Sequence, residues 1–234
     1  ARVPLAGGAP REVLEDVYWA DWAPDAKSLA VVHVVGGKGR LEFPIGKVLY
    51  ETPGLIWGAR ISPQGDRIAF FERPFGPGNW TLAVLDLAGK KTTFSTWFSA
   101  WGLAWSPDGA ELWFTATEKG LAGALYAVTL SGRQRLLARV PGILALRDVS
   151  RDGRALLMRH DFRGAIMGLA PGQTQERDLS WLDTSLAAGL SPDGKTLVFV
   201  EGGEGGRGAF AVYLRKTDGS PAVRLGEGMP MALS

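Results

Sequence analysis

The chain contains no cysteine. Disulfide bonds, thiolate metal ligands and cysteine nucleophiles are therefore excluded. No apolar run approaches the length of about 18 residues that a membrane-spanning helix needs, so the sequence predicts no membrane insertion by this chain. No secretory signal peptide is recognisable, but the chain begins at Ala1 rather than at a methionine. We therefore expect a processed protein, an excised module or a fragment.

The chain also lacks a large excess of one charge and lacks the motifs of hydrolytic enzymes. Lys and Arg number 26 against 24 Asp and Glu, for a formal net charge of +2. Because the basic residues are scattered rather than clustered, the sequence predicts no nucleic-acid partner. No Gly-x-Ser-x-Gly segment, the nucleophile elbow of α/β-hydrolases, is present, and there are only two histidines. We therefore predict that the chain has no catalytic residues and is not an enzyme.

What the chain does contain is one short phrase that occurs five times. The copies are Trp-Ala-Pro-Asp-Ala-Lys (22–27), Ile-Ser-Pro-Gln-Gly-Asp (61–66), Trp-Ser-Pro-Asp-Gly-Ala (105–110), Val-Ser-Arg-Asp-Gly-Arg (149–154) and Leu-Ser-Pro-Asp-Gly-Lys (190–195). Their third residues, which we call the markers, are 39, 44, 44 and 41 residues apart. Even spacing of this length is typical of a repeat architecture.

Each copy carries the signals of a β-hairpin. Apolar residues stand five and seven positions after every marker, and this alternation predicts a strand, while Pro-Asp-Gly predicts the preceding turn. Two further strands follow in most copies. The third strands are predicted at 80–87, 124–130, 165–169 and 209–214, and the fourth at 91–96, 134–138, 175–179 and 222–225. Residues 40–43 and 47–50 are predicted as the outer pair of the first copy. Four antiparallel strands per repeat make the blade of a β-propeller.

We therefore predict an all-β chain that forms a single β-propeller domain over 1–234, with five full repeats of four-stranded antiparallel blades and parts of a sixth. The predicted blades are 17–53, 54–98, 99–142, 143–182 and 183–228. In the sixth, shared blade, 1–16 would supply the outer strands (1–5 and 10–15) and 229–234 the first strand. Its second strand is missing, so we expect either a longer parent propeller or completion by a second chain.

The repeat resembles that of a known propeller family. Ser-Pro-Asp-Gly-Lys (191–195) followed by Leu197 and Phe199 is similar to the WD-like repeat of TolB-type periplasmic propellers and of prolyl-oligopeptidase propeller domains. The segments 7–13 and 19–24 resemble propeller regions attached to bacterial serine/threonine kinases. Gln64 replaces the aspartate of the repeat in the second copy, and Arg151 replaces the proline in the fourth. The resemblance implies a β-propeller scaffold in a periplasmic or other extracytoplasmic compartment.

Three features invite a chemical interpretation that the repeat makes unnecessary. His33 and His160 both stand nine residues after a marker, so they are predicted at equivalent surface or rim places of remote blades. The glycine-rich stretch 202–208 precedes a strand rather than a helix, which favours a hairpin connection over a phosphate-binding loop. The turn aspartates are expected to bond local amides, so no metal and no cofactor are predicted; they are Asp25, Asp108, Asp152 and Asp193.

Charged residues on the innermost predicted strands are better candidates. Asp21, Arg60 and Asp148 stand three residues before their markers, and Arg147 replaces the small or apolar residue of other copies. Two interpretations remain open. These residues form ion pairs between neighbouring blades, or they form a small ligand-binding site at the channel mouth.

Two tryptophans lie outside the repeat pattern, in segments that join blades. Trp97 and Trp181 are therefore predicted to be exposed and to bind a partner. The leading function is a non-catalytic scaffold that binds a protein, peptide or small ligand, as the sensor part of a larger bacterial protein. The alternative is the gating propeller of a prolyl-oligopeptidase-like hydrolase whose catalytic domain lies outside this chain.

Overall fold

The computed structural model describes residues 6–120, 122–140, 142–160, 163–169, 172–202, 204–206 and 209–230. Within these residues the chain forms strands β1 to β20 and a single 3₁₀ turn, η1 (Glu204–Gly206). Among them, no helix is long and apolar enough to span a bilayer. Every pair of neighbouring strands within a sheet is antiparallel.

The first three repeats each form a four-stranded sheet. Blade 1 contains β1 (Val17–Trp22), β2 (Leu29–Val35), β3 (Lys38–Glu42) and β4 (Val48–Thr52). Blade 2 contains β5 (Gly54–Ile61), β6 (Arg67–Pro74), β7 (Trp80–Asp86) and β8 (Lys91–Trp97). Blade 3 contains β9 (Ser99–Trp105), β10 (Glu111–Thr117), β11 (Ala124–Thr129) and β12 (Gln134–Arg139).

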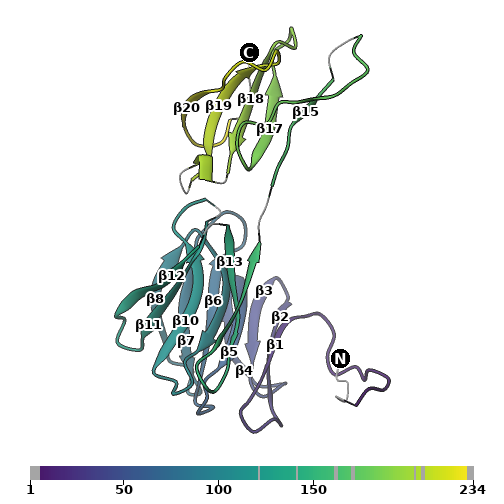
Figure 1. Cartoon of the computed structure of the whole chain (residues 1–234). Coiled ribbons are helices and arrows are strands. Elements are labelled where there is room, and N and C mark those ends of the chain that lie inside the picture. The colour runs from purple at the N-terminus through teal and green to yellow at the C-terminus, as the bar shows by residue number, and fades with distance from the viewer. Residues whose placement is uncertain are drawn as a thin grey trace.

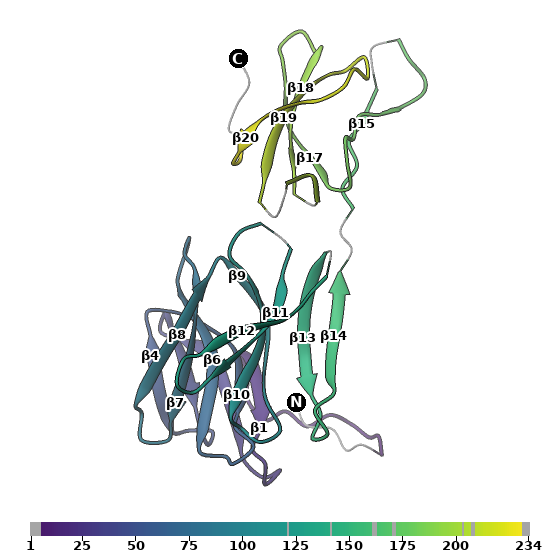
Figure 2. The same cartoon turned by 60° about the vertical axis from the view of Figure 1, so that its left-hand side comes forward.

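The fourth repeat is divided, and the fifth is complete. In blade 4, β13 (Ile143–Val149) pairs with β14 (Ala155–His160), whereas β15 (Met167–Gly168) and β16 (Arg177–Asp178) form a separate two-stranded sheet. Blade 5 contains β17 (Ser185–Leu190), β18 (Thr196–Glu201), β19 (Ala211–Lys216) and β20 (Val223–Glu227). The hairpin β13–β14 lies with blades 1 to 3, and β15 lies with blade 5 (Figures 1 and 2). The sheets have the blade topology of a β-propeller, but they do not close into a ring.

The repeated phrase forms the turn between the first and second strands, as predicted. In blade 3, the Gly109 amide donates to the Ser106 carbonyl at 2.9 Å, and the Ala110 amide donates to Asp108 Oδ1 at 3.0 Å. Gly109 has a φ of 70°, which residues with a side chain rarely adopt. Ser106 Oγ donates to the Asp108 carboxylate and accepts the Glu111 amide. Serine, aspartate and glycine each stabilise this turn, although blade 1 forms it with Ala23 and with Ala26 at a φ of 54°.

The turn aspartates predict a pH-dependent contribution to stability. Hydrogen bonds from Ser106 Oγ and the Ala110 amide hold the pKa of Asp108 below its usual 3.8. Because the folded-state pKa is lowered, this stabilisation is present above pH 3.8 and is lost as the pH falls through the folded value. Asp108→Ala should therefore lower the melting temperature at pH 7, and the difference should shrink below pH 4. Asp108→Asn, which keeps an acceptor but does not titrate, is the control. An equal loss at all pH values would contradict this assignment.

The core lies between the sheets and is built from the predicted alternating positions. Phe70, Phe114 and Phe199 stand seven residues after their markers and are fully buried. Phe71 packs edge-on against Phe114, with ring centroids 6.1 Å apart, and so joins blades 2 and 3. A second cluster joins blades 1 and 2 through residues such as Val32 and Ile68. The blades are therefore held together by apolar contacts between neighbouring sheets.

Two predicted boundaries differ from the structure. Residues 10–15, predicted as a strand of the shared sixth blade, contain no strand element. The other predicted parts of that blade, 1–5 and most of 229–234, lie outside the described residues. The fourth repeat keeps only two paired residues in each outer strand, where five were predicted at 165–169 and at 175–179.

Candidate functional site

Arg60, on β5, joins four blades at their inner edge. Its Nη1 donates to Asp21 Oδ1 on β1 at 3.3 Å, and its Nη2 donates to Asp148 Oδ1 on β13 at 3.2 Å. Its Nε donates to the Leu103 carbonyl on β9 at 3.0 Å, and Nη2 also donates to the Arg147 carbonyl at 2.5 Å. The first strands of blades 1 to 4 are in contact here, which lets one guanidinium reach all of them.

Asp21 is the buried carboxylate of this cluster. Its Oδ2 accepts the Ile61 amide at 2.8 Å, and its side chain is 19% exposed, against 64% for Asp148. Burial raises the pKa of Asp21, and the Ile61 amide and the Arg60 charge only partly offset this effect. Charged Asp21 thus depends on Arg60 more than Asp148 does.

The structure brings together three of the four residues that the sequence singled out on the inner strands. Arg147 takes part through its carbonyl, while its side chain turns to Met158, with Nη2 3.3 Å from Sδ. The Arg60 backbone is held in turn by Trp105, whose Nε1 donates to its carbonyl at 2.9 Å. The bonds made by Arg60 all run between blades, which favours the ion-pair interpretation. Ligand binding at the channel mouth remains a prediction.

In blades 1, 2 and 5, the ninth residue after the marker (His33, Glu72 or Glu201) belongs to a polar cluster that the sequence did not reveal. His33 is 9% exposed and its Nε2 lies 3.0 Å from Glu42 Oε1, so its predicted surface or rim place is wrong. Burial acts to raise the pKa of Glu42, but hydrogen bonds from the Gly46 amide and His33 outweigh it, so the pKa is lowered. His160, at the same position of blade 4, is exposed as predicted.

Blades 2 and 5 place glutamates at this ninth position. Glu72 accepts Lys91 Nζ at 2.6 Å and the Tyr50 hydroxyl of blade 1 at 2.7 Å. Burial alone would lower the pKa of Lys91, but its bonds to Glu72 and Tyr50 raise it. Glu201 is fully buried and accepts the Leu182 amide and the Ser185 hydroxyl. The Glu72 cluster links blades 1 and 2, and the Glu201 cluster links β18 to the segment that enters β17.

The two tryptophans chosen as partner-binding residues have opposite environments. Trp97 is 3% exposed and packs against Phe114 and Tyr126, with centroids 5.5 and 4.6 Å away. Its predicted exposure is wrong because Trp97 is the last residue of β8 and packs in the core between blades 2 and 3, whereas the next residue, Phe98, is 47% exposed. Trp181 is 36% exposed, as predicted, and the guanidinium of Arg215 lies 5.5 Å from the centroid of its ring.

The residues that precede and follow Trp181 in sequence, Ser180 and Leu182, line a hollow, although Trp181 itself is not part of its lining. Leu182 is 50% exposed, and it lines an open hollow of about 570 Å³ together with Arg163, Asp178 and Ser180. Arg215 is fixed over Trp181 by donating to the Ser180 carbonyl at 2.5 Å. We call Trp181, Leu182 and this hollow the Trp181 surface.

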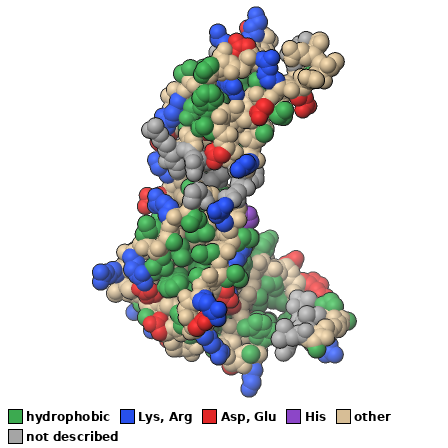
Figure 3. Space-filling view, in the orientation of Figure 1, with side chains coloured by type: hydrophobic (Ala, Val, Ile, Leu, Met, Phe, Trp, Pro, Cys, Tyr) green, Lys and Arg blue, Asp and Glu red, His purple; other side chains and the backbone are tan. Residues whose placement is uncertain are grey.

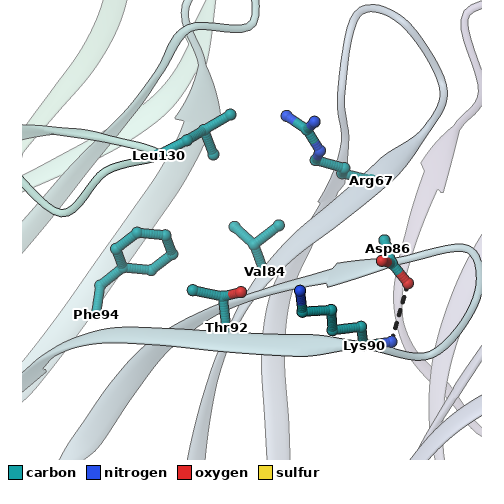
Figure 4. Close-up of a pocket in the computed structure, with 7 residues that line it drawn as sticks. All are labelled: Arg67, Val84, Asp86, Lys90, Thr92, Phe94 and Leu130. Carbon is teal, nitrogen blue, oxygen red and sulfur yellow. Dashed lines mark hydrogen bonds between the residues drawn. The ribbon is translucent and has the colours of Figure 1, made fainter.

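A second hollow, of about 240 Å³, lies between blades 2 and 3 (Figure 4). Val84, Phe94 and Leu130 form its apolar part, and Lys90 and Arg67 its cationic rim. The carboxylates at or next to this hollow already have hydrogen-bond or ion-pair partners within the chain. Asp86 accepts the Lys90 amide at 2.9 Å, and Asp66 lies 3.6 Å from the Arg67 guanidinium.

Metal and phosphate chemistry find no support in the part of the chain that the structure describes. No group of three or more His, Cys, Asp or Glu residues there is arranged to hold a metal ion. The described turn aspartates bond their own turns, as Asp193 does with the Lys195 amide at 3.0 Å. The glycine-rich stretch connects β18 to β19 through η1, as a hairpin connection, although Gly203, Arg207 and Gly208 lie outside the described residues. On the face shown in Figure 3, acidic and basic side chains are interspersed.

Comparisons with known proteins identify the fold. No family model and no curated protein matches the sequence. The structure is similar to TolB from Acinetobacter baumannii, with a TM-score of 0.54 and 20% identity over 92% of this chain and 55% of that one. It thus spans about half the length of that structure. A putative TolB from Agrobacterium tumefaciens follows, with a TM-score of 0.49 and 19% identity over 89% of this chain and 82% of that one. A prolyl endopeptidase is also similar, with a TM-score of 0.49 and 14% identity over 93% of this chain and 36% of that one.

Proposed function

Since the chain has the β-propeller fold of the TolB type, we propose that it is a non-catalytic binding module whose Trp181 surface takes an extended, partly apolar peptide segment of a protein partner. The observations that carry this proposal are the exposed Trp181, held under the Arg215 guanidinium, and the hollow of about 570 Å³ that its sequence neighbours Ser180 and Leu182 line. A tryptophan fixed in this way loses little conformational entropy on binding, and tryptophan is enriched among residues that dominate binding energies.

The chemistry of the surface supports a peptide rather than a small polar ligand. Trp181 and Leu182 offer adjacent apolar contacts, while Arg163, Asp178 and Ser180 offer charged and hydrogen-bonding groups around the hollow. An apolar anchor beside a polar rim is the arrangement found at the centre of protein interfaces. The inner polar cluster around Arg60 is the competing candidate for a binding site. Its described hydrogen bonds join one blade to another, which favours a structural role for it and supports the Trp181 surface as the binding site.

Peptide selection tests this proposal. A random peptide library is panned on the immobilised chain, and the affinity of the enriched peptides is measured by fluorescence anisotropy. We expect Trp181→Ala to weaken binding by about tenfold or more, as for a residue at the centre of an interface. Trp22→Ala is the matched control, because Trp22 is 44% exposed on blade 1. Peptides that bind the Trp181→Ala variant as tightly as the unchanged chain would overturn the proposal, and so would an equal loss with Trp22→Ala.

A further inference from the structure

The hollow between blades 2 and 3 continues into another one along strand β8. This neighbouring hollow, of about 290 Å³, shares Thr92, Phe94 and Leu130 with the hollow of Figure 4. Hydroxyl and amide groups are added to its lining by Thr93, Ser95, Ser131 and Gln134. Because the two hollows share walls, they form one groove, which we call the β8 groove.

One face of blade 2 forms the floor of the β8 groove. Arg67 of β6 is paired with Asp86 of β7, and Val84 of β7 is paired with Thr92 of β8. Directly paired residues, and residues two apart in a strand, place their side chains on the same face of a sheet. These side chains and that of Phe94 therefore share the face that packs against blade 3.

Two cationic side chains extend into the groove at one end. In Figure 4 the Arg67 guanidinium points toward Leu130 and the Lys90 ammonium toward Thr92. Among the described residues, neither side chain donates a hydrogen bond, and the one ion-pair contact is that of Arg67 Nε with Asp66, at 3.6 Å. Both cations can therefore donate to a ligand without losing a hydrogen bond within the described chain.

The equivalent place in blade 3 is neutralised within the sheet. Glu111 stands four residues after its marker, as Arg67 does, and it pairs with Arg135 Nη2 at 2.7 Å. In blade 2 the two places hold Arg67 and Thr92, as the pairing of the second and fourth strands with the third shows. Blade 2 thus presents an unbalanced cation where blade 3 forms an ion pair.

The carboxylate of Asp86, which also lines the groove, is bonded by its own turn. Its Oδ1 accepts the amides of Ala88 and Lys90, each at 2.9 Å. Hydrogen bonds from backbone amides stabilise the charge of a carboxylate and fix its position. Two cations without hydrogen-bond partners therefore face one engaged carboxylate, so the charge of this end of the groove is complementary to an anion.

We propose that the β8 groove binds the carboxyl-terminal segment of a peptide whose last residue is apolar. Arg67 and Lys90 donate to the terminal carboxylate, and the last side chain packs on Phe94 and Leu130. The hydroxyl and amide groups farther along the groove bond the preceding peptide groups, a contact that a small free carboxylic acid does not make. This site lies on blades 2 and 3 and does not depend on the Trp181 surface.

Paired peptides test this proposal. A fluorescein-labelled tetrapeptide that ends in leucine is titrated with the chain and followed by anisotropy, with either a free terminal carboxylate or a terminal amide. We expect the amide form to bind at least about tenfold more weakly, because it loses the charge-assisted hydrogen bonds to two cations. Since this comparison uses the unchanged chain, it holds whatever the stability of any variant. Equal affinity of the two forms would overturn the proposal.

Substitution of the cations locates the site. Arg67→Gln and Lys90→Gln should each weaken binding of the free carboxylate form about threefold, as for partly exposed charge pairs, and should leave the amide form unaffected. Lys47→Gln is the matched control. The Lys47 carbonyl accepts the Phe43 amide in blade 1 as the Lys90 carbonyl accepts the Asp86 amide in blade 2. An equal loss with Lys47→Gln would show attraction by positive charge alone and would contradict the site.

Two further measurements separate this site from its competitors. N-acetyl-leucine that displaces the peptide with equal affinity would show that the groove takes a small carboxylate, and would overturn the peptide assignment. Trp181→Ala should change the affinity of the tetrapeptide by less than about twofold, since distant sites act independently. A large loss would place the peptide on the Trp181 surface, which would refute the β8 groove but leave the proposed function standing.

Discussion

Arg60→Met is expected to lower the free energy of unfolding by about 3 kcal/mol, as for removal of one partner from a buried ion pair. The guanidinium bonds Asp21, Asp148 and two backbone carbonyls of other blades, and its side chain is only 18% exposed. Methionine keeps much of the apolar stem of arginine. The loss of stability therefore measures the missing polar contacts rather than the opening of a cavity. Urea unfolding monitored by tryptophan fluorescence measures it.

The pH dependence of this loss identifies Asp21 as the partner that matters. The pKa of Asp21 is raised by burial above its usual 3.8, so its protonated form is favoured by folding and stability declines as the pH rises through the folded value. Without Arg60 the charged form is opposed more strongly. The cost of Arg60→Met should therefore be larger at pH 7 than at pH 4.

Arg67→Met is the matched control for Arg60→Met. Arg67 lies in the same blade, but its side chain is 40% exposed and its ion pair with Asp66 spans 3.6 Å. Exposed pairs contribute at most about 1 kcal/mol, so this variant should unfold almost as the unchanged chain does. Equal losses for the two variants would contradict the structural role of Arg60.

Gly102→Ala is expected to lower the free energy of unfolding by at least about 2 kcal/mol through overpacking. Gly102 lies on β9 where β13 crosses closely, and an added Cβ would lie 1.8 Å from the Leu146 carbonyl oxygen. Rotation of a side chain cannot relieve this clash because the atom met is a backbone oxygen. The backbone of Leu146 is also held in place, since its amide donates to the buried Thr115 hydroxyl at 3.0 Å. Strand β13 must therefore move, which also disturbs the Arg147 carbonyl that Arg60 binds.

Gly226→Ala provides the control for this second prediction. Gly226 lies on β20, has no positive φ, and an added Cβ would meet nothing within 4 Å. Its replacement should change the free energy of unfolding by no more than about 0.5 kcal/mol. Thermal and urea unfolding of both variants make the comparison. A neutral Gly102→Ala would show that β9 and β13 do not approach as closely as the structure has them.

The repeat allowed most of the fold to be predicted. The glycine and aspartate of the turn phrase stabilise the turn by local contacts, so the hairpins between first and second strands could be recognised without knowledge of tertiary contacts. Outer strands were placed within a few residues, as in β8 and β12. The division of blade 4 could not be predicted, because its sequence carries the same turn phrase and the same apolar alternation as the other repeats.

The candidate site was less predictable, since it depends on contacts between blades. The charges of Asp21, Arg60 and Asp148 stood out, but only the geometry shows that one guanidinium bonds both carboxylates. Trp97 was misplaced because a residue outside the repeat pattern can still be buried by a neighbouring sheet. His33 was misplaced because its partner Glu42 lies on the next strand, beyond what spacing from the marker reveals.

The central claim is that Arg60 links blades through Asp21 rather than forming part of a ligand-binding site. A double-mutant cycle on these two residues tests this claim most directly. The free energy of unfolding is measured for Asp21→Asn, Arg60→Met and the double variant at pH 7. We predict a coupling energy of at least about 1 kcal/mol, as for residues in contact. Losses that add within about 0.5 kcal/mol would show that the pair contributes nothing to folding, and would return Asp21 and Arg60 to the list of ligand-binding candidates.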